Sequence, residues 1–174
     1  MPKRPLSTLP MDARAAAFKA VYRKLKEDPI LNSVVEKWSH VPTHIPTAAD
    51  LPYVRVWAAP GTIAVGSPSR HNAEIIISFD YAINAAGMSE EDAWMHSINF
   101  YGQVEKAINP FSEPEWLVSA IQKAEPGAVY RGLRIEKQGF GTSFVPDLNA
   151  IKGECRIAIE LKLPACRPTP TPPE

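Results

Sequence analysis

Hydrophobic and polar residues alternate along two stretches of the chain, Ala73 to Ile83 and Gly153 to Leu163. In the second stretch, large aliphatic residues alternate with mostly charged ones from Arg156 onward. This period of two predicts a strand with one buried and one solvated face. In the first stretch Ile75, Ile77 and Phe79 share a face, but Ile76 interrupts the polar face. We therefore expect the first strand to be central or covered on both sides.

A helix is predicted between these strands, from Ser89 to Ile108. Ser89 can accept a hydrogen bond from the amide of Asp92, and acids in the first turn complement the helix dipole. Asn109 and Pro110 end the helix. Its pattern predicts a stripe that packs on a sheet: Trp94, Ile98, Tyr101, Glu105 and Ile108, widened by Ala93, Phe100, Val104 and Ala107.

The remaining pattern predicts shorter elements on both sides of this core. They are an amphipathic helix from Pro10 to Glu27, a short helix from Asn32 to Trp38, a strand from Tyr53 to Ala58, a helix from Glu113 to Ala124 and a strand from Tyr130 to Lys137. Residues 59–72 are expected to form a long loop. The strand from Tyr130 is expected to form a long hairpin with the last strand, with a protruding tip at residues 138–149.

Together these elements predict an α+β fold: a mostly antiparallel sheet, an N-terminal helix and a central helix packed on it, and a long C-terminal β-hairpin. The length of 174 residues fits one domain. Eight of the 18 prolines lie in residues 1–10 and 164–174. We therefore expect a single domain over residues 1–163 with an extended arm at 1–9, and a flexible proline-rich tail at 164–174.

The net charge is zero, which gives no electrostatic argument for tight nucleic-acid binding. The charges are nevertheless segregated: residues 1–27 hold seven Lys or Arg and two acids, whereas residues 74–125 hold nine acids and two lysines. Such charges can be solvated, pair within the fold or pair between copies. We expect no membrane-spanning segment and no secretory signal. Cys155 is expected to be a buried thiol, because it shares a face with Ile157 and Ile159.

A search for catalytic and ligand-binding motifs finds none. Gly139-Phe140-Gly141 lacks the third glycine and the following helix of a dinucleotide site, and no phosphate-binding loop is present. Pro42 stands between His40 and His44, which prevents helical spacing of two metal ligands. We expect no catalytic residue, no cofactor and no metal. Function is instead expected at exposed loops.

Element order and phrases such as Leu51-Pro52-Tyr53-Val54 carry a resemblance over residues 12–163. The chain resembles the tail terminator proteins of long-tailed bacteriophages and phage-like particles. The resemblance implies a homo-oligomeric ring, hexameric in the family, that caps the tail tube, stops its polymerisation and offers a surface to the head. Its implied partners are the tail tube protein and the head–tail connector protein, and DNA passes through the lumen without specific binding. The implied location is the head-proximal end of the tail in the virion, after assembly in the host cytoplasm.

Four residues are expected to contact ring neighbours or the tube. They are Arg70 and His71 in the loop, and Phe140 and Phe144 in the hairpin tip.

Three other functions stay open. Head–tail connector and neck proteins share a similar α+β plan. An enzyme could assemble its site from scattered residues such as His71, Asp80 and Arg134, and would need a concave pocket. A monomeric module could capture a peptide on its sheet edge or through its proline-rich tail.

Overall fold

The computed structural model describes residues 12–41, 43–59, 63–67, 70–109, 114–136 and 143–164. The expected arm at 1–9, residues 165–174 and Phe140 lie outside them. The described elements, in chain order, are α1 (Ala13–Glu27), α2 (Pro29–Val34), β1 (Lys37–Ser39), the 3₁₀ helix η2 (Ala48–Asp50), β2 (Tyr53–Ala59), β3 (Ile63–Ser67), β4 (Arg70–Asn84), α3 (Glu90–Ile108), α4 (Glu115–Ala124), β5 (Val129–Glu136), β6 (Ser143–Val145), the 3₁₀ helix η3 (Pro146–Leu148) and β7 (Ala150–Pro164).

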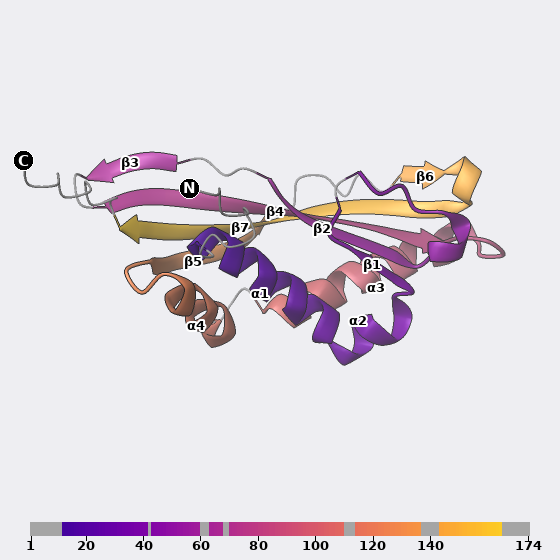
Figure 1. Cartoon of the computed structure of the whole chain (residues 1–174). Helices are drawn as coiled ribbons and strands as arrows, with labels where there is room; N and C mark the ends of the chain where they lie inside the picture. Colours follow the sequence, from indigo (N-terminus) through magenta and orange to yellow (C-terminus); the bar gives the residue numbers. More distant parts are fainter. Residues whose placement is uncertain are drawn as a thin grey trace, which may run out of the picture.

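Two long strands form the centre of a single sheet, and the four described helices lie on one face of it (Figure 1). β4 and β7 pair antiparallel over all 15 residues of each. The outer edge of β4 is shared by β2 and β3, and the outer edge of β7 by β5 and β6. β1 adds to β2 in parallel. The α+β class, the mostly antiparallel sheet, both packed helices and the C-terminal hairpin of β5 and β7 are thus confirmed.

The buried core lies between the helices and the sheet, as the alternation of the two long strands predicts. Ile77 and Phe79 of β4 and Ile157 and Ile159 of β7 are fully buried on the helix-covered face. Val21 and Leu25 of α1, Val104 and Ile108 of α3, and Leu117 and Ile121 of α4 complete the core. Burial of these aliphatic side chains stabilises the fold by about 1.5–3 kcal/mol each.

The start of the central helix is as predicted. The Ser89 hydroxyl accepts a hydrogen bond from the amide of Asp92 at 3.1 Å and donates one to the Asp92 carboxylate at 2.7 Å. The buried stripe, however, is rotated from the prediction. Trp94 and Ile98 are 38% and 47% exposed, whereas Ser97 is fully buried. Ser97 fits the core because its hydroxyl forms a 2.6 Å hydrogen bond with the Tyr81 hydroxyl of β4.

Three local predictions are corrected. Residues 59–72 are not a long loop, since β3 pairs with the start of β4 in this stretch. The short helix begins earlier than predicted, at Pro29, because the Asp28 carboxylate accepts from the amides of Ile30 and Leu31. Residues 37–39, which the prediction assigned partly to that helix, pair with β2 instead.

The expected hairpin tip is also corrected for its described part, residues 143–149. β6 does not project, because it lies along the edge of β7 with Phe144 opposite Ile151.

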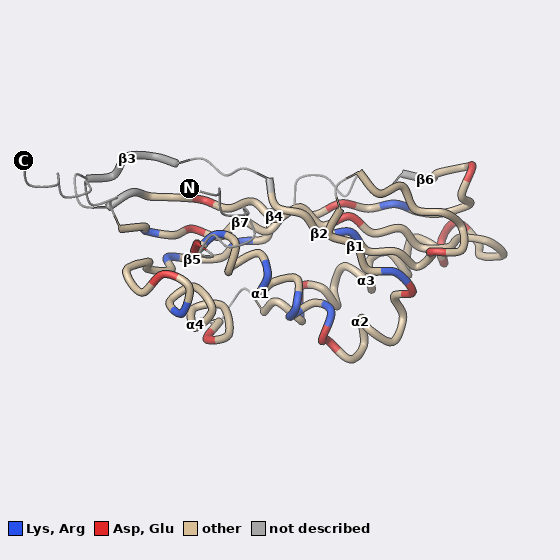
Figure 2. The backbone as a smooth tube through the Cα atoms, viewed as in Figure 1, with Lys and Arg blue, Asp and Glu red and all other residues tan. Residues whose placement is uncertain are grey.

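The segregated charges appear on different parts of the fold. Lys and Arg residues lie along α1, whereas the strands carry both signs (Figure 2). The part of α1 nearest its start is neutralised within the chain, since Arg14 pairs with Asp12 at 2.7 Å. Arg23 and Glu27 lie 3.9 Å apart and are both two-thirds exposed, so this pair contributes little to stability.

Candidate interaction surfaces

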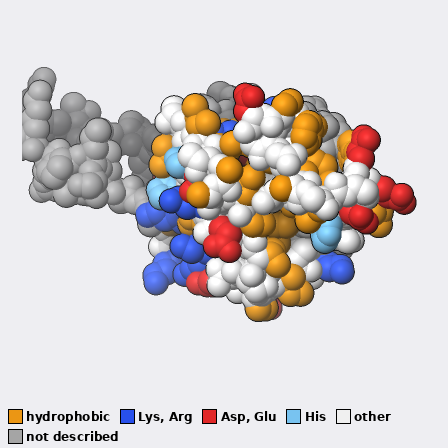
Figure 3. Space-filling model, turned by 90° about the vertical axis from the view of Figure 1, so that its right-hand side faces the viewer, with side chains coloured by type: hydrophobic (Ala, Val, Ile, Leu, Met, Phe, Trp, Pro, Cys, Tyr) orange, Lys and Arg blue, Asp and Glu red, His pale blue; other side chains and the backbone are white. Residues whose placement is uncertain are grey.

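Apolar side chains that the core does not use gather around the start of α3. This α3 surface consists of Met88, Trp94, Met95, Ile98 and Phe144, each between 38% and 56% exposed. Trp94 and Ile98 are four residues apart and therefore adjacent on the helix. Figure 3 views the molecule from the end that carries β6, where hydrophobic side chains lie across the middle and a group of acidic side chains lies at the right-hand edge. Several exposed apolar residues in one place are typical of an interaction site.

The α3 surface is hollowed rather than flat. Met88, Trp94 and Phe144 line a cavity of about 510 Å³ together with Ile151 of β7. A second cavity of about 340 Å³ lies beside it and shares Met88. The acidic first turn of α3 borders the first cavity through Glu90. Glu90 and Glu91 are exposed and form no ion pair with any residue that the structure describes.

A groove with the opposite charge runs between α1 and α4. This α1–α4 groove has a volume of about 830 Å³. Small or aromatic residues form much of it, namely Ala16, Ala20, Trp116, Ala120 and Ala124. Lys19, Arg23 and Lys123 line it as well. Lys19 and Lys123 form no ion pair within the described residues. The groove therefore combines an apolar floor with unneutralised positive charge.

The face of the sheet opposite the helices carries ion pairs between neighbouring strands. Arg134 of β5 pairs with Glu160 of β7 and reaches across to Glu74 of β4. Arg156 and Glu154, both on β7, lie 3.4 Å apart. Because positive and negative side chains are close together, this face has little net field.

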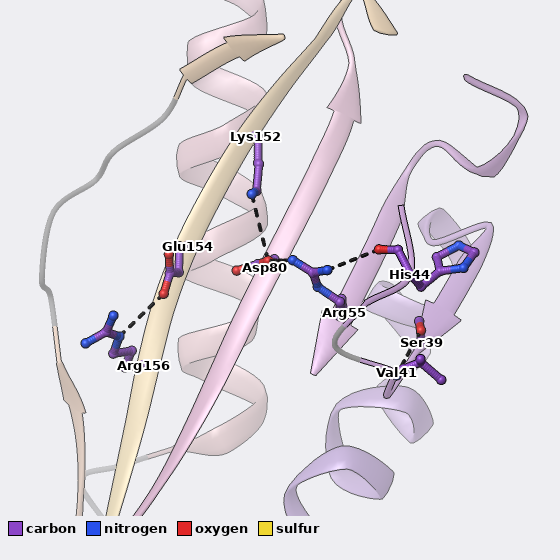
Figure 4. A network of polar contacts seen from close by, with 8 residues as sticks. All are labelled: Ser39, Val41, His44, Arg55, Asp80, Lys152, Glu154 and Arg156. Carbon is purple, nitrogen blue, oxygen red and sulfur yellow. Dashed lines mark hydrogen bonds and ion pairs between the residues drawn. The ribbon is translucent and has the colours of Figure 1, made fainter. Parts of the chain in front are cut away.

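A more buried ion cluster on the same face surrounds Asp80 (Figure 4). Arg55 of β2 donates to the Asp80 carboxylate through Nη2 and to the carbonyl oxygen of His44 through Nη1, the latter at 3.1 Å. Its guanidinium also lies 4.8 Å from the ring centre of Trp57. The Lys152 amine is 3.9 Å from the carboxylate. The cluster thus joins β2, β4, β7 and the segment before η2.

Asp80 is 3% exposed, and its burial raises the pKa of the carboxyl above the usual range although Arg55 and Lys152 oppose this shift. We assign a structural role to the cluster, since its ion pairs join β2 and β7 to β4 and its hydrogen bond to His44 joins the segment before η2 to β2. Sequence reasoning missed the pair of Arg55 and Asp80. Both stand at polar positions of alternating strands, but only the register places them opposite each other.

The structure does not bring together His71, Asp80 and Arg134, the residues of the hypothetical enzyme site. His71 and Asp80 are nine residues apart on one strand, a separation of about 30 Å. Arg134 lies opposite Ala158, whereas Asp80 lies opposite Glu154, four residues before Ala158 on β7. Three groups so far apart cannot act on one bond.

Of the four predicted contact residues, the structure describes one side chain. Phe144 is 56% exposed and belongs to the α3 surface. Arg70 and His71 begin strand β4 rather than lying in a loop, opposite Pro164 and Leu163 of β7. This end of β4 is far from Phe144, which lies beside the start of β7. Phe140 lies outside the described residues. The predicted residues therefore do not form one patch.

Two further properties of the described chain bear on the type of site. None of its groups of His, Cys, Asp and Glu brings three members close enough together to hold a metal ion. None of its helices has the length and apolar character needed to cross a membrane.

The chain matches no protein-family model, and no curated protein matches its sequence.

Proposed function

We propose that the chain is a structural subunit that assembles into a ring and acts as a tail terminator of a long-tailed phage or phage-like particle. The ring, hexameric by resemblance, would cap the tail tube, stop its polymerisation and offer a surface for head attachment. The observation that carries this proposal is the α3 surface. The best-specified helix of the chain leaves Trp94 and Ile98 exposed, although their spacing fits burial, and the neighbouring Met95 is exposed as well.

An exposed apolar surface on the central helix supports an assembly role, because large apolar side chains gain stability when a partner removes them from water. Aromatic residues and methionine are enriched at protein interfaces. The α3 surface contains Trp94, Phe144 and two methionines. The sheet face with its paired charges fits a second part of the proposal, the passage of DNA, because a basic lumen would retain the duplex by releasing its counterions.

Tube polymerisation tests the proposal. The full-length chain is added to a polymerising tail tube protein of the same phage, and tube lengths are measured by electron microscopy. We expect tubes that stop growing and carry a ring at one end. The proposed cap depends on contacts that the α3 surface makes. A Trp94→Ser variant is therefore expected to cap less well than the matched surface variant Glu36→Lys.

Tubes of unchanged length, with no ring at either end, would contradict the proposed function. A head–tail connector or neck protein is the second candidate, since it shares the α+β plan. It would bind the connector at the head vertex and leave tube length unchanged. A peptide-binding module would stay monomeric at all protein concentrations.

A further inference from the structure

We infer that the α3 surface of one copy binds in the α1–α4 groove of the next copy. This inference rests on the proposed ring and names its interface. The two surfaces match in side-chain size, since α3 presents the large exposed side chains of Trp94, Met95 and Ile98 and the groove is floored by small ones. They are also complementary in charge, because Glu90 and Glu91 border the first and Lys19 and Lys123 line the second. Complementary charge selects the partner and sets the register of an interface.

The positions of the two surfaces exclude their contact within one molecule. α4 lies at one end of the sheet, and the first turn of α3 lies towards the other end, near β6 (Figure 1). A surface that fits a different surface on an identical molecule forms a head-to-tail interface. Successive copies then form a closed ring or an open helix, depending on the rotation from one copy to the next.

Trp94 is the expected anchor of this interface. Buried tryptophans surrounded by residues that exclude water contribute most of the binding free energy in many interfaces. Its 38% exposure leaves much of the indole available to a partner. In the groove, Trp116 and the four alanines provide an apolar floor on which an indole can pack.

The alternative pairing of two α3 surfaces in a symmetric dimer is disfavoured by charge. It would bring Glu90 and Glu91 of both copies together, and like charges facing each other weaken association. A head-to-tail contact avoids this repulsion and uses the positive charge of the groove.

Charge reversal on either side tests the interface. One variant carries Glu90→Lys and Glu91→Lys, and the other carries Lys19→Glu and Lys123→Glu. Asp92 is kept because it bonds to Ser89 at the start of the helix. We expect each variant alone to shift from the wild-type mass to the monomer in native mass spectrometry. An equimolar mixture is expected to recover the wild-type mass, because intact surfaces meet intact grooves and reversed surfaces meet reversed grooves.

The control variant carries Glu36→Lys and Arg131→Glu, two exposed positions that belong to neither surface. It is expected to keep the wild-type mass. Trp94→Ser, which changes no charge, is expected to give monomers with the wild-type circular dichroism spectrum. This second variant separates loss of the interface from loss of the fold.

Two results would overturn the interface: charge-reversed variants that keep the wild-type mass, or a mixture that stays monomeric. In both cases the wild-type ring, and with it the proposed function, would stand. A wild-type chain that forms no ring at any concentration would contradict the proposed function as well.

Discussion

At the residue scale, the contact of Tyr81 with Gly153 and Ser97 determines how the central helix lies on the sheet. The Tyr81 ring occupies the space that a side chain at Gly153 would need, since a Cβ there would be 2.3 Å from the ring. The same ring ends in the hydroxyl that bonds to Ser97. Because Gly153 has no side chain, the Tyr81 ring can lie over it on the helix-covered face of the sheet and reach α3.

Gly153→Ala is therefore expected to lower the free energy of unfolding by about 1–3 kcal/mol, because overpacking displaces a buried ring. Gly102→Ala is the matched control. It lies on α3 with no atom within 4 Å of a new Cβ, so alanine's higher helix propensity should raise stability by about 0.5–1 kcal/mol. Urea denaturation of both variants measures the difference. Equal effects of the two substitutions would contradict the described packing.

Cys155 provides a test by pH. Burial raises the pKa of its thiol from 9.0 to about 12, and burial likewise raises the pKa of Tyr101 to about 12. Between about pH 9 and pH 12 the unfolded chain loses the Cys155 proton that the folded chain retains. The same holds for the Tyr101 proton between about pH 10 and pH 12. Stability should therefore be full below about pH 9 and fall as the pH rises towards 12, by up to about 1.4 kcal/mol per pH unit for each group.

The measurement is the free energy of unfolding from pH 8 to pH 11, with Cys155→Ala as the comparison. The variant is expected to lose stability less steeply. In a Cys166→Ala background, the remaining Cys155 thiol should not react with a thiol reagent at pH 8 until the protein is unfolded. Rapid reaction of the folded protein would contradict the burial of Cys155.

At the element scale, α3 shows how far sequence reasoning extends. Local signals were sufficient for its bounds, because Ser89 and Asn109 act within one turn of the helix. They were also sufficient for all but the ends of both long strands, whose alternation reports burial directly, although the first three residues of each strand were missed. The face of α3 that is buried could not be predicted in the same way. Trp94 and Ile98 are apolar at helical spacing whether they meet the core or a partner, and the partner of Ser97 is known only from the fold.

This rotation of α3 predicts a small change in stability for one substitution and a large loss for another. Ile98→Ser should change the free energy of unfolding by less than about 0.5 kcal/mol, since the side chain is 47% exposed. Val104→Ala should cost about 1–3 kcal/mol, because Val104 is fully buried and its truncation leaves a cavity. Thermal or urea denaturation measures both. If Ile98→Ser lowers the free energy of unfolding more than Val104→Ala does, Ile98 is buried as the sequence pattern predicts, and the described rotation is wrong.

Pairing between elements limited the prediction elsewhere. The β3–β4 contact in residues 63–73 and the return of β6 along β7 depend on strand register. The alternation within one strand shows which of its faces is buried, but it does not show which strand lies beside it. Arg70 and His71 were expected in a loop for this reason. The basic and acidic segments were visible in the sequence. The α1–α4 groove could not be predicted from it, because the groove forms only where the two helices pack together.

At the scale of the whole molecule, the fold has a helix-covered face and a face of paired charges. It also has two surfaces of opposite charge towards different ends. These surfaces leave the folded chain with exposed apolar area that association would bury. The proposed head-to-tail ring accounts for the segregated charge and the exposed part of α3 with a single contact.

The central claim is most directly tested by the mass of the assembled wild-type chain in native mass spectrometry over a range of protein concentrations. A head-to-tail ring predicts one closed species, an integer multiple of the 19.2 kDa chain, with no larger multiples as the concentration rises. A chain that stays monomeric, or that stops at a symmetric dimer, would contradict the account.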